Sequence, residues 1–198
     1  MTAQPLLSVE DLTVSYGGQA PVVENVSFAV DGGAMTAVVG ESGSGKTTSA
    51  MAVIGLLGPA GRVHSGSIRF KGKEISRATP AEWRGLRGAE IGLVPQDPNS
   101  SLNPLKTIGA AIEAGLAIHK YGDAASRRSR ALELLAQVGI DDPARRYGQY
   151  PHELSGGMKQ RVLIAAAVAP EPAVIIADEP TSALDVTVQK TILDLLCL

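Results

Sequence analysis

The stretch GESGSGKTT, residues 40–48, decides the fold of this chain. It fits the pattern G-x-x-x-x-G-K-[ST], with Gly40, Gly45, Lys46 and Thr47 in register. Glycines let backbone N–H groups turn inward around phosphate oxygens, and a helix that begins directly after them adds its positive dipole end. A flexible Gly/Ser turn is the plain alternative. Because the match stands between an apolar segment and a predicted helix, we interpret it as a phosphate-binding loop.

The sequence around this loop predicts a mixed α/β domain. Residues 35–40 are apolar throughout, which is typical of a strand buried on both faces of a parallel sheet. Residues 12–16 and 26–30 each place apolar side chains at every second position, on one face, as half-buried strands do: Leu12, Val14 and Tyr16, and Val26, Phe28 and Val30. Further strands are predicted at 65–72, 91–97 and 173–178, and helices at 46–57, 125–139 and 156–169. The helix at 125–139 is expected to bury Leu132, Leu135 and Val138 and to end at Gly139.

The stretch AVIIADEP, residues 173–180, supplies a second part of a phosphate site. Asp178 ends an apolar strand, the place where open α/β sheets bind ligands, and its carboxylate can hold Mg²⁺. Glu179 is placed to act as a general base on an attacking water. A solvated acidic pair at a strand end is the alternative, and the apolar run before it favours the site.

The stretch LSGGMKQR, residues 154–161, predicts a second turn that binds an anion at the start of a helix. A serine N-cap would account for Ser155 alone. It does not account for Gly156 and Gly157, because each glycine in a first turn lowers helix propensity.

Charge and composition argue against a nucleic-acid-binding, a disulfide-bonded or a membrane-spanning protein. The 198 residues carry a net charge of −2, and no Lys/Arg run exceeds two residues, so no basic stripe for nucleic acid is expected. The single cysteine, Cys197, excludes an internal disulfide. No apolar stretch is long enough to cross a bilayer. These features predict a soluble chain of a reducing compartment.

In this order and spacing, GESGSGKT, LSGGMKQR and IIADEP resemble the ATP-binding subunit of an ABC transporter, over essentially the whole chain. The resemblance implies an α/β fold of the P-loop NTPase class, the ABC-type nucleotide-binding domain. It also implies an N-terminal antiparallel β-subdomain and a helical insertion. We therefore expect one domain over residues 1–198, with a helical subdomain at about 98–153.

The resemblance implies ATP and Mg²⁺ as cofactors and gives roles to single residues. Tyr16 would stack on adenine, and Asp185 would lie in a loop that crosses a dimer interface. Ser155, Gly156 and Gly157 would contact the γ-phosphate of ATP held by the opposite subunit. The phosphates would contact Gly40, Glu41, Ser42, Gly43, Ser44, Gly45, Lys46, Thr47 and Thr48. Mg²⁺ would be held by Thr47, Gln96 and Asp178, and catalysis would use Glu179, Gln96 and Lys46.

The stretches PQDPNSSLNP and RRYGQYPHEL resemble the dipeptide, oligopeptide and nickel importer group. This implies transmembrane permease subunits, a second ATP-binding subunit packed head to tail, and an extracytoplasmic substrate-binding protein. The chain would then lie peripherally on the cytoplasmic face of the cell membrane. The alternatives are a soluble ABC ATPase acting on nucleic acid or ribosomes, and a non-catalytic nucleotide-dependent module, against which Glu179 argues.

The family also carries a histidine after a further strand downstream of the DEP motif. Here the chain ends nineteen residues after Glu179, and all three histidines lie upstream of it. We therefore expect a truncated chain, one that lacks the strand between residues 35–40 and 173–178.

Overall fold

β1 (Leu7–Tyr16) is an inner strand of an antiparallel sheet with the order β2-β1-β3-β4. It pairs with β2 (Val23–Val30) along one edge and with β3 (Gly61–Phe70) along the other. β4 (Lys73–Glu74) adds to the free edge of β3. The strands predicted at 12–16, 26–30 and 65–72 are therefore confirmed, each longer than or shifted from its predicted bounds.

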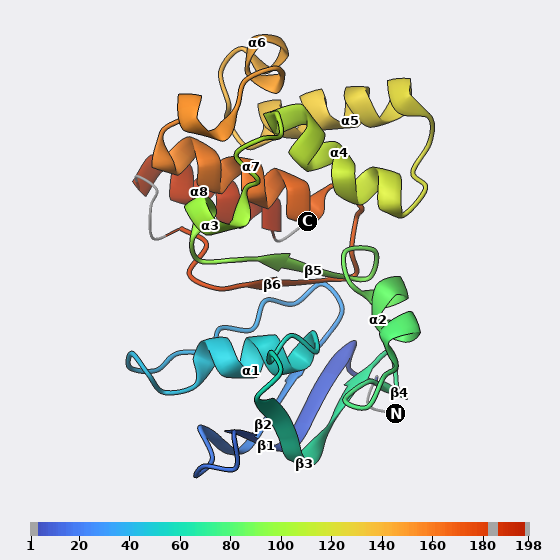
Figure 1. Ribbon diagram of the computed structural model, residues 1–198, viewed down its shortest axis with the longest axis vertical. Helices are drawn as coiled ribbons and strands as arrows, with labels where there is room; N and C mark the ends of the chain where they lie inside the picture. Colours follow the sequence, from blue (N-terminus) through green and yellow to red (C-terminus); the bar gives the residue numbers. More distant parts are fainter. Residues whose placement is uncertain (1–3, 182–185, 197–198) are drawn as a thin grey trace. The chain divides into compact units, whose positions relative to one another are not determined.

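The computed structural model describes residues 4–181 and 186–196 (Figure 1). These residues form two compact units, one up to residue 87 and one from residue 88 onward. The antiparallel sheet belongs to the first unit.

A β-bulge in β1 changes which of its side chains face the core. Asp11 has a φ of 50° and the pairing of β1 with both neighbours shifts around it. The Ser27 hydroxyl accepts a hydrogen bond from the Asp11 N–H at 2.8 Å. After the bulge, Leu12, Thr13 and Val14 are all buried. The predicted burial of Leu12 and Val14 is confirmed, whereas the burial of Thr13 follows from the bulge and has no signal in the alternation.

Two helices complete the first unit. α1 (Lys46–Val53) ends earlier than predicted, because Gly55 has a φ of 65° and reverses the chain. α2 (Pro80–Leu86) begins with a capping box. In it the Thr79 hydroxyl accepts from the Glu82 N–H at 3.3 Å, and the Glu82 carboxylate accepts from the Thr79 N–H at 2.8 Å.

Residues 35–40 contradict the predicted buried strand. They form no strand, and Met35, Val38 and Val39 are 59%, 52% and 90% exposed. A strand forms where a neighbour takes up its N–H and C=O groups. Among residues 4–181 and 186–196, no strand pairs with this segment. The apolar composition of residues 35–40 therefore predicted a strand wrongly, because such a segment becomes a strand only where a partner strand pairs with it.

The second unit contains a parallel pair of strands, β5 (Ile91–Val94) and β6 (Val174–Ala177). Its remaining elements are helical: α3 (Pro98–Ser101), α4 (Ile108–Ile118), α5 (Ala124–Gln137), α6 (Pro143–Tyr147), a 3-10 turn η1 (Pro151–Glu153), α7 (Gly156–Val168) and α8 (Val186–Leu196). The helical character predicted for residues 98–153 is present. That these residues form a separate subdomain stays a prediction.

β6 is less buried than its apolar sequence predicts. Val174 is buried, but Ile175 and Ile176 are half-buried and Ala177 is exposed. Among the described residues β6 pairs with β5 alone. A sheet of two strands leaves more of each strand uncovered than the wide parallel sheet that an apolar run indicates.

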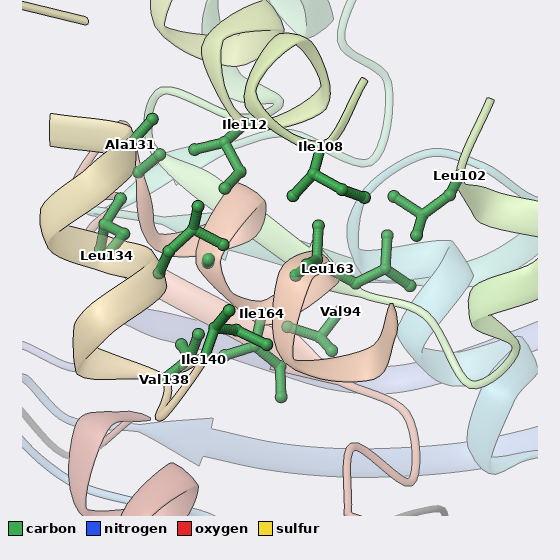
Figure 2. Packing of buried hydrophobic residues seen from close by; sticks show 14 of the residues in the cluster. Val94, Leu102, Ile108, Ile112, Ala131, Leu134, Val138, Ile140, Leu163 and Ile164 are labelled. Carbon is green, nitrogen blue, oxygen red and sulfur yellow. The ribbon is translucent and has the colours of Figure 1, made fainter. Parts of the chain in front are cut away.

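The core of the second unit lies between its helices and β5. α7 packs on β5, and α4 and α5 pack on α7. Figure 2 shows their buried side chains converging, with Ile108 and Ile112 from α4, Leu134 from α5 and Ile164 from α7. Burying one such side chain contributes roughly 1.5–3 kcal/mol, so this cluster holds the helices in fixed positions beside the strands.

α5 confirms the predicted helix and its end, with one correction on its buried face. Gly139 has a φ of 73°, and the Ile140 N–H donates to the Leu135 carbonyl at 2.9 Å, which closes the helix. Leu134 is fully buried and Leu132 only partly, so the face that meets the core is rotated from the predicted stripe.

Candidate nucleotide-binding site

The loop before α1 has the backbone that a phosphate cradle needs. Gly43 and Gly45 have φ values of 83° and 93°, a region that side-chain-bearing residues rarely adopt. A Cβ on Gly45 would lie 2.9 Å from Cγ2 of Val23 and 3.0 Å from the carbonyl oxygen of Val22. Glycine is therefore required at position 45 both for the turn and for the close approach of the loop to β2.

Lys46 is the first residue of α1 and turns back across the loop. Its Nζ donates hydrogen bonds to the carbonyls of Gly40 at 2.7 Å and Glu41 at 2.8 Å. Gly45, the N-cap, offers no side chain to the first N–H groups of α1, and the first turn contains no acidic residue. The start of α1 therefore presents backbone donors, its positive dipole end and an ammonium group at one place.

Tyr16 ends β1 in the same unit and is half-buried. It pairs with Gly61 of β3, and a Cβ on Gly61 would lie 2.7 Å from Cε1 of the tyrosine ring. The glycine therefore allows the ring to lie over the β3 backbone.

The carboxyl ends of β5 and β6 bring three predicted site residues close together in the second unit. The Asp178 N–H donates to the Val94 carbonyl at 3.0 Å, which continues the parallel pairing by one residue. The Gln96 side chain follows β5, and its Nε2 donates to the Glu179 carboxylate at 2.7 Å. Glu179 has a φ of 48°, in the left-handed region. The structure thus joins Gln96 to Glu179, and Asp178 directly precedes Glu179 in the chain.

Ser155 caps α7, the role that the plain alternative gives it. Its hydroxyl accepts from the Met158 N–H at 3.3 Å. A Cβ on Gly156 would meet nothing within 4 Å. Packing against residues 4–181 and 186–196 therefore does not require glycine at position 156, and these residues leave the space beside it open.

Contacts between α7 and the segment around Gln96 had no signal in the sequence. Lys159 Nζ donates to Asn99 Oδ1 at 2.8 Å. Gln160 is 1% exposed, and its Nε2 reaches the Pro95 carbonyl at 3.5 Å. Each contact joins residues at least 60 positions apart, and no local pattern predicts such a pair.

The predicted site residues fall into two groups. Tyr16 and residues 40–48 belong to the first unit, and Gln96, residues 155–157, Asp178 and Glu179 belong to the second. Asp185 lies outside the described residues. That these residues bind nucleotide stays a prediction.

Two further properties of residues 4–181 and 186–196 bear on function. None of their helices has both the length and the apolar character to span a membrane. In the same ranges, no group of three or more His, Cys, Asp or Glu side chains is arranged to hold a metal ion.

The family model described as ABC transporter matches residues 23–182. The chain belongs to the ABC transporter family. Among the curated relatives of this ABC chain is the dipeptide transport ATP-binding protein DppD of Escherichia coli (strain K12). The two are 48% identical over 194 residues, which make up 96% of the ABC chain and 59% of DppD. The oligopeptide transport ATP-binding protein OppD of Bacillus subtilis (strain 168) is 46% identical over 195 residues, or 96% and 54% of the two chains. The ABC chain thus spans between a half and two thirds of these relatives.

A solved structure supports the same fold for the ABC chain. It is the ATP-binding cassette MJ0796, described as a dimer in a post-hydrolysis state bound to ADP and Pi. It superposes with a TM-score of 0.85 at 31% identity and covers 96% of the ABC chain and 81% of its own. The predicted fold class, a P-loop NTPase of the ABC type, is confirmed.

Proposed function

We propose that this chain binds ATP and hydrolyses it to drive an importer. The observation that carries the proposal is the phosphate loop, where glycine backbone, the start of α1 and the Lys46 ammonium meet. Nucleotide phosphates would take the place of the Gly40 and Glu41 carbonyls as acceptors for Lys46 Nζ. The solved cassette that this chain resembles is described with ADP and Pi, which supports a nucleotide as the ligand.

We propose Mg²⁺ as the cofactor, held by Thr47, Gln96 and Asp178. Hydroxyl, amide and carboxylate oxygens are the donors that Mg²⁺ prefers, and it keeps water and substrate phosphates as its other ligands. Gln96 fits this role, because its Nε2 donates to Glu179 and its Oε1 is the end that remains to face a cation. Bound Mg²⁺ would neutralise phosphate charge.

The remaining residues take roles around the nucleotide. Tyr16 stacks on adenine, and Glu179 accepts a proton from the attacking water. Residues 155–157 contact the γ-phosphate on a second subunit, for which the open space at Gly156 leaves room. Asp185 belongs to the same interface. Residues 1–198 act as one nucleotide-binding domain with a helical subdomain at about 98–153.

Peptides are the substrate class that we propose for the importer, with nickel as the alternative in the same group. The names of the relatives, dipeptide and oligopeptide transport ATP-binding proteins, support peptides. The partners would be permease subunits, a second ATP-binding subunit and an extracytoplasmic substrate-binding protein, with this chain on the cytoplasmic face of the membrane.

Replacing Lys46 tests the nucleotide site. Lys46→Ala removes a charge-assisted donor, a loss of roughly 1.5–3 kcal/mol, so ATP binding should weaken about 10- to 100-fold in calorimetric titration. Lys106→Ala, which removes an exposed lysine from the second unit, is the control and should leave the affinity unchanged. Equal affinities for the two variants would refute the phosphate-loop role.

Purification distinguishes an importer subunit from a soluble ABC ATPase that acts on nucleic acid or ribosomes. The chain, carried with its neighbouring genes, should co-purify with integral membrane subunits, and peptide should stimulate its ATP turnover in vesicles. Recovery with ribosomes or DNA instead would favour a soluble ABC ATPase.

A further inference from the structure

The C-terminal end of α1 is held by a residue from another helix. After α1 the Gly55 N–H donates to the Ala52 carbonyl at 3.0 Å, and the Leu56 N–H donates to the Met51 carbonyl at 2.8 Å. This Schellman turn satisfies two of the last carbonyls and leaves later ones to other donors. The last turn of α1 contains no basic residue of its own.

Arg87, which follows α2, supplies those donors. Its Nε donates to the Ile54 carbonyl at 2.8 Å and its Nη2 to the Gly55 carbonyl at 2.6 Å. A guanidinium presents its donors as a rigid fork and can hold two acceptors at once, whereas an ammonium acts as a point charge. A positive charge at this end of a helix also stabilises the helix dipole.

Trp83 of α2 holds the guanidinium of Arg87 in place. The Arg87 Cζ lies 4.8 Å from the centre of the Trp83 ring, and Trp83 is 7% exposed. A Cβ on Gly55 would lie 2.5 Å from Cε2 of the indole, so the ring lies directly against Gly55. Arg87 is half-buried, and this burial lowers the pKa of its guanidinium.

α2, which ends directly before Arg87, is linked to the antiparallel sheet. Glu82 of α2 forms an ion pair of 2.7 Å with Lys73 of β4, in addition to its part in the capping box. Arg87 therefore connects the end of α1 to a helix that is tied to the antiparallel sheet.

We propose that Arg87 is a positioning residue for phosphate binding: with Trp83 it fixes the C-terminal end of α1, and thereby the direction of Lys46 and of the first N–H groups. The inference rests on the proposed function. α1 has eight residues, about 12 Å, and helices this short are marginal without tertiary support. Gly45 offers no side-chain cap at the N-terminal end of α1. The side-chain hydrogen bonds from Arg87 therefore hold the helix at its other end, opposite the phosphate loop.

Arg87→Met tests this role, because methionine keeps an apolar stem for Trp83 and loses both donors. The matched control is Arg84→Met, which removes an exposed arginine from the same helix. ATP affinity should fall about tenfold in Arg87→Met, because part of the binding free energy would then be used to order α1, and tenfold corresponds to about 1.4 kcal/mol. The affinity for adenosine should stay the same, since adenosine carries no phosphate and would contact Tyr16. The ATP affinity of Arg87→Lys should lie between those of Arg87→Met and Arg84→Met.

Hydrogen exchange gives a second readout that does not depend on nucleotide. The amides of Gly55 and Leu56 should exchange faster in Arg87→Met than in Arg84→Met. Equal exchange in the two variants, or a parallel loss of ATP and adenosine affinity, would overturn the proposal. If the parent chain binds no ATP, the proposed function fails, and exchange at the end of α1 still decides whether Arg87 holds it. If Arg87→Met does not fold, the same two measurements, nucleotide affinity and amide exchange at Gly55 and Leu56, are made on Arg87→Lys and decide the proposal.

Discussion

Glu179 occupies a strained backbone position at the end of β6. Its φ of 48° costs a residue with a side chain about 1–2 kcal/mol, and such residues cluster at functional sites. The hydrogen bond from Gln96 Nε2 orients the carboxylate. A carboxylate can only accept in this contact, so the amide nitrogen of Gln96 must be the end that faces Glu179.

Glu179→Gln should separate ATP binding from hydrolysis. The amide cannot take a proton from water, so turnover should fall about 10²- to 10⁴-fold, while ATP affinity stays near the parent value. Because the introduced amide would keep an acceptor oxygen for Gln96, the variant removes the base and preserves the contact. Phosphate release under saturating ATP measures the effect, with Glu24→Gln at an exposed position of β2 as control. Parent-like turnover in Glu179→Gln would remove this residue from the mechanism.

At the scale of elements, the start of α2 should make folding stability depend on pH. The hydrogen bond from Lys73 is the largest cause that lowers the pKa of Glu82 from 4.5 to about 2, followed by the bonds from Thr79. A lowered folded-state pKa means that the stabilisation is fully present above pH 4.5 and is lost as pH falls toward 2. Urea unfolding between about pH 7 and 2 should show a smaller loss in Glu82→Gln than in the parent chain.

Lys73→Met provides the cross-check for this contact. It should remove much of the same acid dependence, and the double variant should add little to either single change, because both act on one contact. An acid dependence equal to the parent's in Glu82→Gln would show that the ion pair does not act in solution.

The elements also show what the sequence could predict. Local signals were sufficient for α5, where periodicity and Gly139 mark a helix and its end, and for α7 with its Ser155 cap. They failed for residues 35–40, because pairing depends on a partner far along the chain. Thr13 was missed for a related reason, since a bulge at Asp11 is set by pairing with β2 and β3.

In the candidate site, too, the sequence predicts local contacts and misses those between residues far apart in the chain. The glycines and Lys46 of the phosphate loop lie within a few residues of one another, so the motif predicts their geometry directly. The contact between Gln96 and Glu179 spans 83 positions and depends on the parallel pairing of β5 with β6. Arg87 was invisible in the sequence, because its role comes from where α2 ends relative to α1.

At the scale of the whole molecule, Ser155→Arg tests the proposed contact with a second subunit. Ser155→Ala is its control, because both variants lose the cap of α7, worth about 1 kcal/mol, and only arginine adds bulk. Ser155→Arg should keep ATP binding by the single chain and lose the ATP-dependent dimer in size-exclusion chromatography. In mixed dimers with one variant subunit, loss of ATP from that subunit's own phosphate loop alone would exclude a contact across the interface.

Residues 35–40 pose a question for the whole molecule, because their sequence predicts a buried strand and the structure exposes them. Unpaired apolar segments of this kind promote edge-to-edge association. Val39→Lys should therefore reduce light scattering of the 198-residue chain. Its melting temperature should change by less than about 2 °C, as for other surface substitutions. Leu105→Lys, at a side chain 83% exposed outside this segment, should leave scattering unchanged. A large fall in melting temperature for Val39→Lys alone would mean that Val39 is buried in solution, since a lysine placed in a core must desolvate its charge.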